Sequence, residues 1–191
     1  ASGMSAIACA LMQLCNQGDH IVASDTLYGG TFALLKEFLP QKAGLSVTFV
    51  PATDVAAVAA AFTPRTKALY IEGMANPTLA VADIPALAQL AHQHKAKLVV
   101  DNTFTPLILS PAQLGADVVV HSLTKFVNGA SDYIAGAICG SNEFILELMD
   151  LHTGALMLLG PTMDPQTAYN ISLRIPHLAL RVKEHSRRAA V

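Results

Sequence analysis

Short apolar runs alternate with longer amphipathic runs along most of the chain. The apolar runs are nearly continuous in Val, Ile and Leu, which is typical of strands covered on both faces of a sheet. They predict strands at residues 20–24, 45–50, 67–72, 97–101, 117–122 and 133–139. The runs between them predict helices at residues 4–16, 31–41, 55–62, 84–94 and 143–151. This alternation predicts an α/β fold with right-handed crossovers and a mostly parallel sheet.

Residues with strong backbone preferences mark several of the predicted boundaries. Asp54 and Asp83 precede helical runs, where an aspartate side chain caps the first turn. Gly44 and Gly115 follow helical runs, where the chain is expected to reverse. Gly and Pro at residues 160–165 predict a loop that leads to further helical segments.

Size and composition narrow the class of protein. A chain of 191 residues fits one domain, and no domain boundary is expected within residues 1–191. Hydrophobic residues make up 52% and charged residues 14%, which excludes a disordered chain. The net charge of −2 offers no basic face for nucleic acid, and no apolar run reaches the ~20 residues of a membrane span.

Cysteine and histidine spacing bears on redox state and metals. The three cysteines form an odd set without metal-type spacing, which favours reduced thiols and a cytoplasmic location. The seven histidines do not cluster at metal-ligand spacing, and we interpret all of them as structural or surface residues. No metal site is therefore expected.

Polar side chains follow several of the predicted strands. In open α/β sheets, ligands bind beyond the carboxyl ends of the strands. Asp101 ends one buried strand, and Lys125 follows the next strand along the chain. The other residues expected at this edge are Gly3, Met4, Tyr28, Asn76, Ser122 and Thr124. Each of these residues alone has an ordinary structural explanation, and only their combination indicates a binding site.

The combined chemistry of this edge matches one cofactor. A helix that begins at Gly3 presents backbone N–H groups to a phosphate. A carboxylate such as Asp101 keeps a pyridine nitrogen protonated, and a protonated ring stabilises a carbanion. The amine of Lys125 can form a Schiff base with an aldehyde. Pyridoxal phosphate carries a phosphate, a ring nitrogen, a phenolic oxygen and an aldehyde, so the sequence predicts this cofactor.

Five segments resemble the signature segments of the Cys/Met-metabolism pyridoxal-phosphate enzymes. They lie at residues 2–7, 27–31, 76–77, 100–103 and 121–126. This family includes cystathionine γ-synthase, cystathionine γ- and β-lyases, methionine γ-lyase and O-acetylhomoserine sulfhydrylases. The resemblance implies a three-layer, seven-stranded-type sheet, as in the aminotransferase-like (fold type I) large domain.

The resemblance also implies a role for each matching residue. Lys125 resembles the lysine that holds pyridoxal 5'-phosphate as a Schiff base and later moves protons. Asp101 resembles the partner of the pyridine nitrogen, and Tyr28 resembles the ring that stacks on the cofactor and assists proton transfer. Asn76 resembles the side chain near the phenolic oxygen, and Thr103 is expected near the opposite ring face. The residues that resemble the phosphate cradle are Gly3, Met4, Ser122 and Thr124.

The implied activity is γ-elimination or γ-replacement on a sulfur amino acid or an acylated homoserine. O-acetylhomoserine sulfhydrylase and cystathionine β-lyase remain alternatives. Gly30 stands where methionine γ-lyases often have Cys, which argues against that branch, and Asp132 favours the cystathionine and lyase branch. Ala130 replaces a His of the family segment, and Glu72 is a further site candidate. A homodimer or homotetramer with shared active sites is expected.

Family members are longer than this chain. The 191 residues are therefore expected to be an incomplete large domain, lacking an N-terminal arm and a C-terminal domain, with little turnover alone. Two other classes of protein remain alternatives. A dinucleotide-binding oxidoreductase suits the order of elements, but no Gly-x-Gly-x-x-Gly follows the first strand. The second alternative is a non-catalytic domain that retains the family fold.

Overall fold

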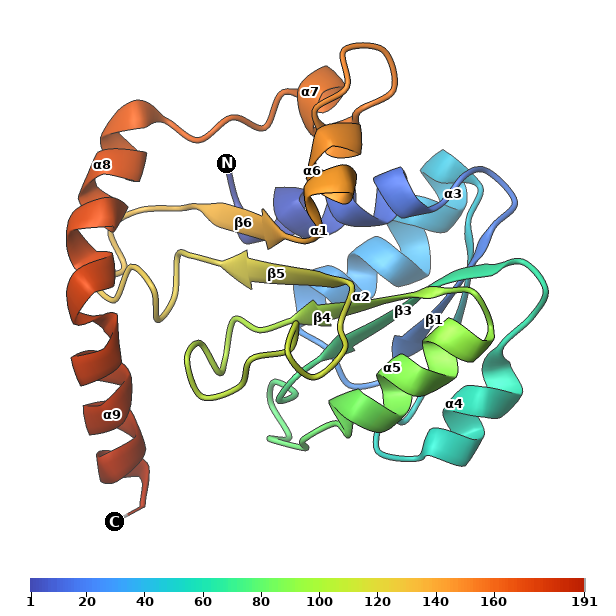
Figure 1. Cartoon of the computed structure of the whole chain (residues 1–191), viewed down its shortest axis with the longest axis horizontal. Coiled ribbons are helices and arrows are strands. Elements are labelled where there is room, and N and C mark those ends of the chain that lie inside the picture. Colours follow the sequence, from blue (N-terminus) through green and yellow to red (C-terminus); the bar gives the residue numbers. More distant parts are fainter. Residues whose placement is uncertain (191) are drawn as a thin grey trace.

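The computed structural model describes residues 1–190, which form one mixed sheet with helices on both faces (Figure 1). The strands are β1 His20–Ser24, β2 Ser46–Val50, β3 Thr66–Glu72, β4 Lys97–Asp101, β5 Val118–Ser122 and β6 Gly136–Cys139. Their order is β2-β1-β3-β4-β5-β6, and only β6 is antiparallel to its neighbour. The prediction of a mostly parallel α/β sheet is confirmed, with six strands within the described residues.

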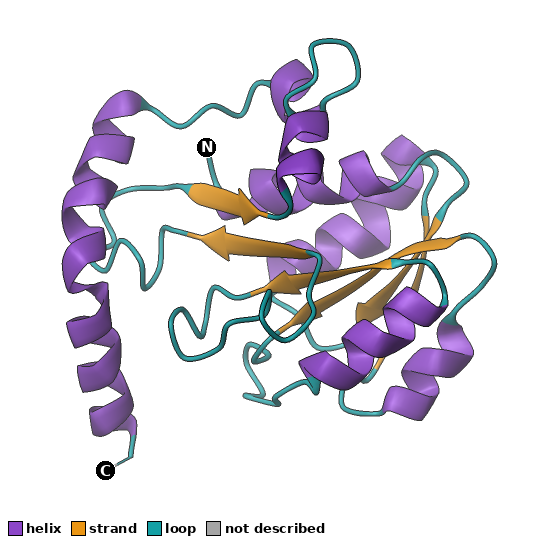
Figure 2. Ribbon diagram, in the orientation of Figure 1, coloured by secondary structure: helices purple, strands orange, loops and turns teal. Residues whose placement is uncertain are grey.

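Helices cover the sheet in two layers (Figure 2). The helical segments are α1 Gly3–Leu14, α2 Gly29–Ala33, η1 Leu34–Phe38, α3 Leu39–Ala43, α4 Val55–Ala61, α5 Ile84–Gln93, α6 Asn142–Leu148, α7 Ala155–Leu159, α8 Pro165–Arg174, η2 Ile175–His177 and α9 Leu178–Ala189. One face carries α1, α2, α3 and α6, and the other carries α4 and α5. No helix of residues 1–190 is long and apolar enough to cross a membrane.

The central strand β3 shows why the apolar runs are continuous. Leu69, Tyr70 and Ile71 are all fully buried, because helices cover the sheet on both sides. Tyr70 belongs to the same buried cluster as Leu11 of α1. Leu69 and Ile71 belong to the cluster of α4 and α5, which includes Leu87. Successive side chains of one strand therefore fill two separate halves of the core.

The predicted helix caps are present. The side chain of Asp54 accepts a hydrogen bond from the Ala57 N–H at 2.9 Å, and that of Asp83 accepts one from Ala86 at 3.1 Å. Gly44 ends α3 in the left-handed conformation, with a φ of 66°. These contacts satisfy backbone groups that a helix end leaves without partners. Both caps and this chain reversal are confirmed.

The helix predicted at residues 31–41 is longer and less regular than expected. It runs from Gly29 to Ala43 as α2, η1 and α3, and η1 is a π-helical turn. Pro40 lies at the start of α3 and has no N–H, so it cannot complete the α-helical bond to Lys36. A wider turn at this point is the usual adjustment of a helix to such a break.

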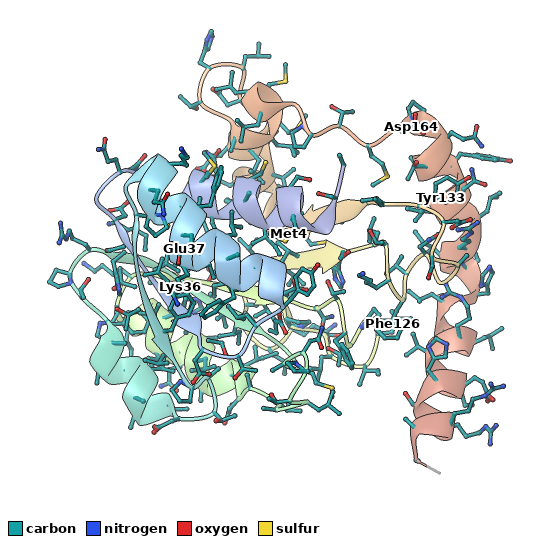
Figure 3. All side chains as sticks on the ribbon, turned by 180° about the vertical axis from the view of Figure 1, so that it is seen from behind. Met4, Lys36, Glu37, Phe126, Tyr133 and Asp164 are labelled. Atoms are coloured by element: carbon teal, nitrogen blue, oxygen red, sulfur yellow. The ribbon has the colours of Figure 1, made fainter. Side chains whose placement is uncertain are left out.

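A third, smaller core attaches α8 and α9 to the loop after β5. Its buried members are Val127, Ala135, Ile171, Leu178 and Val182. The two helices form a column beside the sheet, and Figure 3 shows Phe126 between the sheet and this column. The segment after β5 therefore packs against residues that lie about fifty positions further along the chain.

Two arginines reinforce this attachment. Arg181 of α9 donates hydrogen bonds to the carbonyl oxygens of Phe126 and Val127. Arg174 of α8 forms a bidentate ion pair with Asp132, at 2.6 and 2.8 Å. The backbone on both sides of the turn at Gly129 is thus tied to the α8–α9 column.

Candidate active site

A cavity of about 640 Å³ opens at the carboxyl ends of the central strands. Every residue that the sequence marked as a site candidate lines it: Gly3, Met4, Tyr28, Asn76, Asp101, Thr103, Ser122, Thr124 and Lys125. The segments that supply them are far apart in the sequence and converge because parallel strands end at the same edge of the sheet. Figure 3 shows Met4 at the start of α1, on one side of this edge.

One side of the cavity is the N-terminus of α1. Ser2 caps this helix reciprocally with Ser5, since each side chain accepts a hydrogen bond from the backbone N–H of the other residue. The N–H groups of Gly3 and Met4 belong to the first turn and have no carbonyl partner within the helix. The first turn contains no acidic residue. The N–H groups and the helix dipole therefore favour an anion at this position.

Ser122 lies directly against this helix end. A Cβ atom on Gly3 would lie 2.6 Å from the Ser122 Cβ, so only glycine fits without displacing β5. The Ser122 hydroxyl forms no hydrogen bond within residues 1–190, whereas Thr124 Oγ1 accepts from the Ala135 N–H at 3.0 Å and donates to its carbonyl at 3.3 Å. Of the two hydroxyl residues expected in the phosphate cradle, Ser122 makes no hydrogen bond within residues 1–190, whereas Thr124 is bonded to the backbone of Ala135.

Gly136→Ala tests how tightly the start of α1 is held. A Cβ at this position would lie 2.1 Å from the Ser2 carbonyl oxygen and 2.8 Å from the Gly3 nitrogen. Backbone atoms cannot yield locally, so we expect a loss of about 1–3 kcal/mol in the free energy of unfolding, measured by urea denaturation. Gly29→Ala is the control, since nothing lies within 4 Å of its Cβ. An equal effect of both substitutions would contradict this interpretation.

Asp101 provides a carboxylate on the cavity without a cationic protein partner. Its Oδ1 accepts from the Thr103 N–H at 2.9 Å, and its Oδ2 accepts from the Tyr70 hydroxyl at 3.3 Å. No Lys or Arg of residues 1–190 pairs with it. Burial raises the pKa of Asp101. The hydrogen bonds with Thr103 and the electrostatic influence of the nearby His121 lower it and oppose this rise. A cationic ligand group would offset this desolvation.

Glu72 lies beside Asp101, because the two residues pair in register at the ends of β3 and β4. It is only 8% exposed and accepts two backbone hydrogen bonds, from Tyr28 at 2.7 Å and from Asn76 at 2.9 Å. Burial raises the pKa of Glu72, and these two hydrogen bonds oppose the rise. One carboxylate thus joins the two loops that carry Tyr28 and Asn76 to the cavity.

Glu72→Gln should remove one of the two hydrogen bonds that link the Tyr28 and Asn76 loops through this side chain. A glutamine has one acceptor oxygen and one NH₂ group, so either the Tyr28 or the Asn76 N–H would face another donor. We expect a loss of about 1–3 kcal/mol in the free energy of unfolding, the penalty for a buried donor without a partner. Glu37→Gln, on the exposed face of η1, should change stability by less than about 0.5 kcal/mol. Equal losses in urea denaturation would refute the bridging role.

Lys125 follows β5 and is exposed on the cavity. Tyr28 immediately precedes α2 and is 48% exposed, so its ring is available to a ligand. The cavity also has an apolar wall that the sequence reasoning missed: Met74, Phe104, Phe126 and Ile134. These residues lie in irregular segments, where apolar side chains give no periodic signal.

His185 has a position in the cavity wall that the sequence did not indicate. It is exposed, as predicted, but it also lines the cavity, where it reaches from α9 to within 5.8 Å of the Phe126 ring, measured between ring centroids. A position some sixty residues beyond Lys125 on a polar helix gives no local indication of this contact. The cavity wall thus includes the α8–α9 column.

The residues present fit a phosphorylated pyridine aldehyde. The α1 N-terminus and the Ser122 hydroxyl suit a phosphate, and the unpaired Asp101 carboxylate suits a protonated ring nitrogen. Lys125 provides the primary amine. The donor set therefore agrees with the cofactor predicted from the sequence.

Solved structures share this fold along nearly the whole chain. Cystathionine gamma-lyase from Lactobacillus plantarum, complexed with L-serine, matches with a TM-score of 0.86 and 37% identity over 94% of this chain and 46% of its own. A putative O-acetylhomoserine (thiol)-lyase from Campylobacter jejuni matches with a TM-score of 0.89 and 30% identity over 100% of this chain and 54% of its own. The second structure contains N'-pyridoxyl-lysine-5'-monophosphate.

Curated relatives point to the same chemistry. Methionine gamma-lyase from Arabidopsis thaliana is 58% identical over 100% of this chain and 43% of its own length. Cystathionine gamma-synthase from Mycobacterium bovis is 41% identical over 98% of this chain and 48% of its own length. The chain thus spans less than half the length of these relatives. The family model described as Cys/Met metabolism PLP-dependent enzyme matches residues 1–191. The chain belongs to the Cys/Met metabolism family of enzymes that depend on pyridoxal phosphate.

Proposed function

We propose that this protein catalyses γ-elimination or γ-replacement on a sulfur amino acid or an acylated homoserine, with pyridoxal phosphate attached to Lys125. The observation that carries the proposal is the single cavity shared by Lys125, Asp101 and the N-terminus of α1. These three features match the aldehyde, ring nitrogen and phosphate of the cofactor. Family membership supports the same cofactor.

Elimination from a thioether such as methionine is the reaction that the comparisons favour. The Arabidopsis thaliana relative at 58% identity and a Porphyromonas gingivalis relative at 43% are both named methionine gamma-lyases. This similarity outweighs the single position Gly30, which argued against that branch. Replacement on an acylated homoserine is the second candidate, because relatives named cystathionine gamma-synthase and O-succinylhomoserine sulfhydrylase match at 41% and 39% identity.

Different residues of the cavity would bind different groups of the cofactor. The N–H groups of Gly3 and Met4, with the Ser122 hydroxyl, hold the phosphate. Asp101 would keep the ring nitrogen protonated, and the side chain of Asn76 would contact the phenolic oxygen. The cofactor supplies an electron sink for the carbanion formed from the substrate.

Lys125 and Tyr28 divide the proton transfers. The amine of Lys125 would hold the cofactor before the substrate binds, and as a free amine it would accept the proton from the substrate α-carbon. For γ-chemistry the amine of Lys125, once it has passed on the α-proton, would also accept a proton from the β-carbon before the γ-substituent departs. The Tyr28 hydroxyl would donate a proton to the departing sulfur. Thr103 lines the cavity beside Asp101 and would lie near the cofactor ring.

Covalent trapping and product analysis test the proposal. The protein is incubated with pyridoxal phosphate and reduced with borohydride, and the peptide containing Lys125 should carry the cofactor mass. Methionine, cystathionine and O-acetylhomoserine are then supplied separately. Elimination consumes water and gives a 2-oxo acid, ammonia and the leaving group, which is a thiol from methionine or cystathionine and acetate from O-acetylhomoserine. Replacement requires an added thiol and gives a new thioether. Labelling of another lysine, or none, would refute the attachment. Because residues 1–191 alone are expected to turn over little substrate, turnover is measured on the full-length protein, where labelling without turnover of any substrate would favour the non-catalytic alternative.

Tyr28→Phe should separate proton transfer from cofactor binding. The substitution keeps the ring for stacking and removes only the hydroxyl. We expect kcat for elimination to fall by roughly 10²- to 10⁴-fold, the range for general acid catalysis, with little change in the borohydride-trapped fraction. Tyr169→Phe, on the exposed surface of α8, is the control. Equal losses of trapping and turnover would count against the proton-donor role.

We further propose a cytoplasmic location and a homodimer or homotetramer with shared active sites. Cys9, Cys15 and Cys139 are all free thiols, which supports a reducing compartment. The exposed apolar residues Leu173, Ile175 and Leu180 on the α8–α9 column support burial against another surface. Cell fractionation and sedimentation velocity test the two statements separately. A monomer at micromolar concentration, or a secreted protein, would contradict them.

A further inference from the structure

Tyr70 is the largest fully buried side chain of the protein, and its one polar side-chain atom faces the candidate site. Its hydroxyl donates to Oδ2 of Asp101 at 3.3 Å. Tyr70 pairs in register with Val99, so Asp101 is its diagonal neighbour, two residues further along β4 on the same face. Tyr70 itself does not line the cavity.

The surroundings of the Tyr70 hydroxyl keep it protonated. Burial raises the pKa of Tyr70 well above its usual value, and the carboxylates of Asp101 and Glu72 add to the rise. The hydroxyl therefore keeps its proton, which it donates to Asp101, while the Thr31 side chain also lies within hydrogen-bonding reach of it. Because the Thr103 N–H holds Oδ1 at 2.9 Å, both oxygens of the Asp101 carboxylate are fixed by protein donors.

We propose that Tyr70 is a positioning residue, which fixes the Asp101 carboxylate in the orientation that meets the ring nitrogen of the cofactor. This inference rests on the proposed function, because it assigns the ring nitrogen to Asp101. Tyr70 acts through Asp101 and does not touch the cofactor. Its effect is therefore confined to ligands that have a ring nitrogen.

Tyr70→Phe tests this role with two probe ligands. The substitution removes only the hydroxyl, so the buried ring still fills its place. The affinity for pyridoxal phosphate should fall by about 2- to 10-fold, the effect of one net hydrogen bond. The affinity for 1-deazapyridoxal phosphate, in which carbon replaces the ring nitrogen, should not change. Both affinities are measured by absorbance titration of the cofactor-free protein, with Tyr169→Phe as the control.

A double-mutant cycle supplies the second readout. In an Asp101→Asn background, Tyr70→Phe should weaken pyridoxal phosphate binding less than it does in the unaltered protein, because the two residues act as one unit. Equal weakening of both ligands would show that Tyr70 only supports the fold, and unchanged affinity for both would show no role. Either result overturns the inference. Failure of the unaltered protein to bind pyridoxal phosphate would instead refute the proposed function, and this role with it.

Discussion

Lys125→Ala is expected to abolish borohydride-stable attachment of pyridoxal phosphate and to reduce turnover by at least about 10²-fold. The residue is the one amine among the cavity-lining side chains of residues 1–190, and the proposed chemistry needs it both for attachment and for α-proton removal. Mass spectrometry of the reduced protein and product assays measure the two effects.

The fold should tolerate this change. Lys125 is exposed, so its removal should alter the free energy of unfolding by no more than about 0.5 kcal/mol. Lys125→Arg keeps the positive charge without the nucleophilic amine and should be equally inactive. Lys67→Ala, at an exposed position of β3 outside the cavity, is the matched control. Retained labelling in Lys125→Ala would rule out this lysine as the attachment site.

Asp101→Asn should weaken pyridoxal phosphate binding by roughly 10- to 150-fold. A hydrogen bond between two charged groups contributes about 1.5–3 kcal/mol, and asparagine cannot supply the negative charge that holds the ring nitrogen protonated. Asp25→Asn, which removes an exposed carboxylate after β1, is the control for net charge. Similar affinities for both variants in absorbance titrations would remove Asp101 from the site.

The same substitution should change how the cofactor-free protein responds to pH. Burial raises the folded-state pKa of Asp101, so its contribution to stability is present below the ordinary carboxyl pKa of about 4. That contribution is lost as the pH rises through the raised folded-state value. The stability of the unaltered protein should therefore fall relative to Asp101→Asn over this window. Urea denaturation of both proteins at several pH values measures the difference, and a difference independent of pH would contradict the assigned shift.

Helices and strands could be predicted from the sequence where their burial produces a regular pattern of apolar and polar residues. The predicted ranges of β1 and β4 agree with the structure, because each strand has an apolar centre with a polar residue at both ends, which marks its limits. The five-residue α7 was missed, since so short a helix has no periodicity of its own. The strand predicted at 133–139 begins only at Gly136, because the residues before it form the loop bound to α8.

The candidate site could be predicted as far as its residues follow strands directly. Asp101 and Ser122 end β4 and β5, so the topology of the sheet alone places them at one edge. The role of Tyr70 could not be predicted from its place in a strand, because an aromatic residue inside an apolar strand is expected to be an ordinary core residue. Its contact with Asp101 depends on the register of β3 and β4, which the sequence does not reveal. The position of His185 in the cavity wall likewise depends on how α9 packs, which the sequence does not reveal.

The separation of the buried side chains into clusters has a consequence for local stability. The sheet is enclosed by two large clusters, whereas α8 and α9 rest on a five-residue cluster and a few arginine contacts. Free energies of local opening follow the amount of apolar contact. Amide protons of α9 should therefore exchange with solvent through openings that leave β3 closed. The wall of the cavity beyond Lys125 belongs to this less stable unit, while the Asp101 side belongs to the part that opens last.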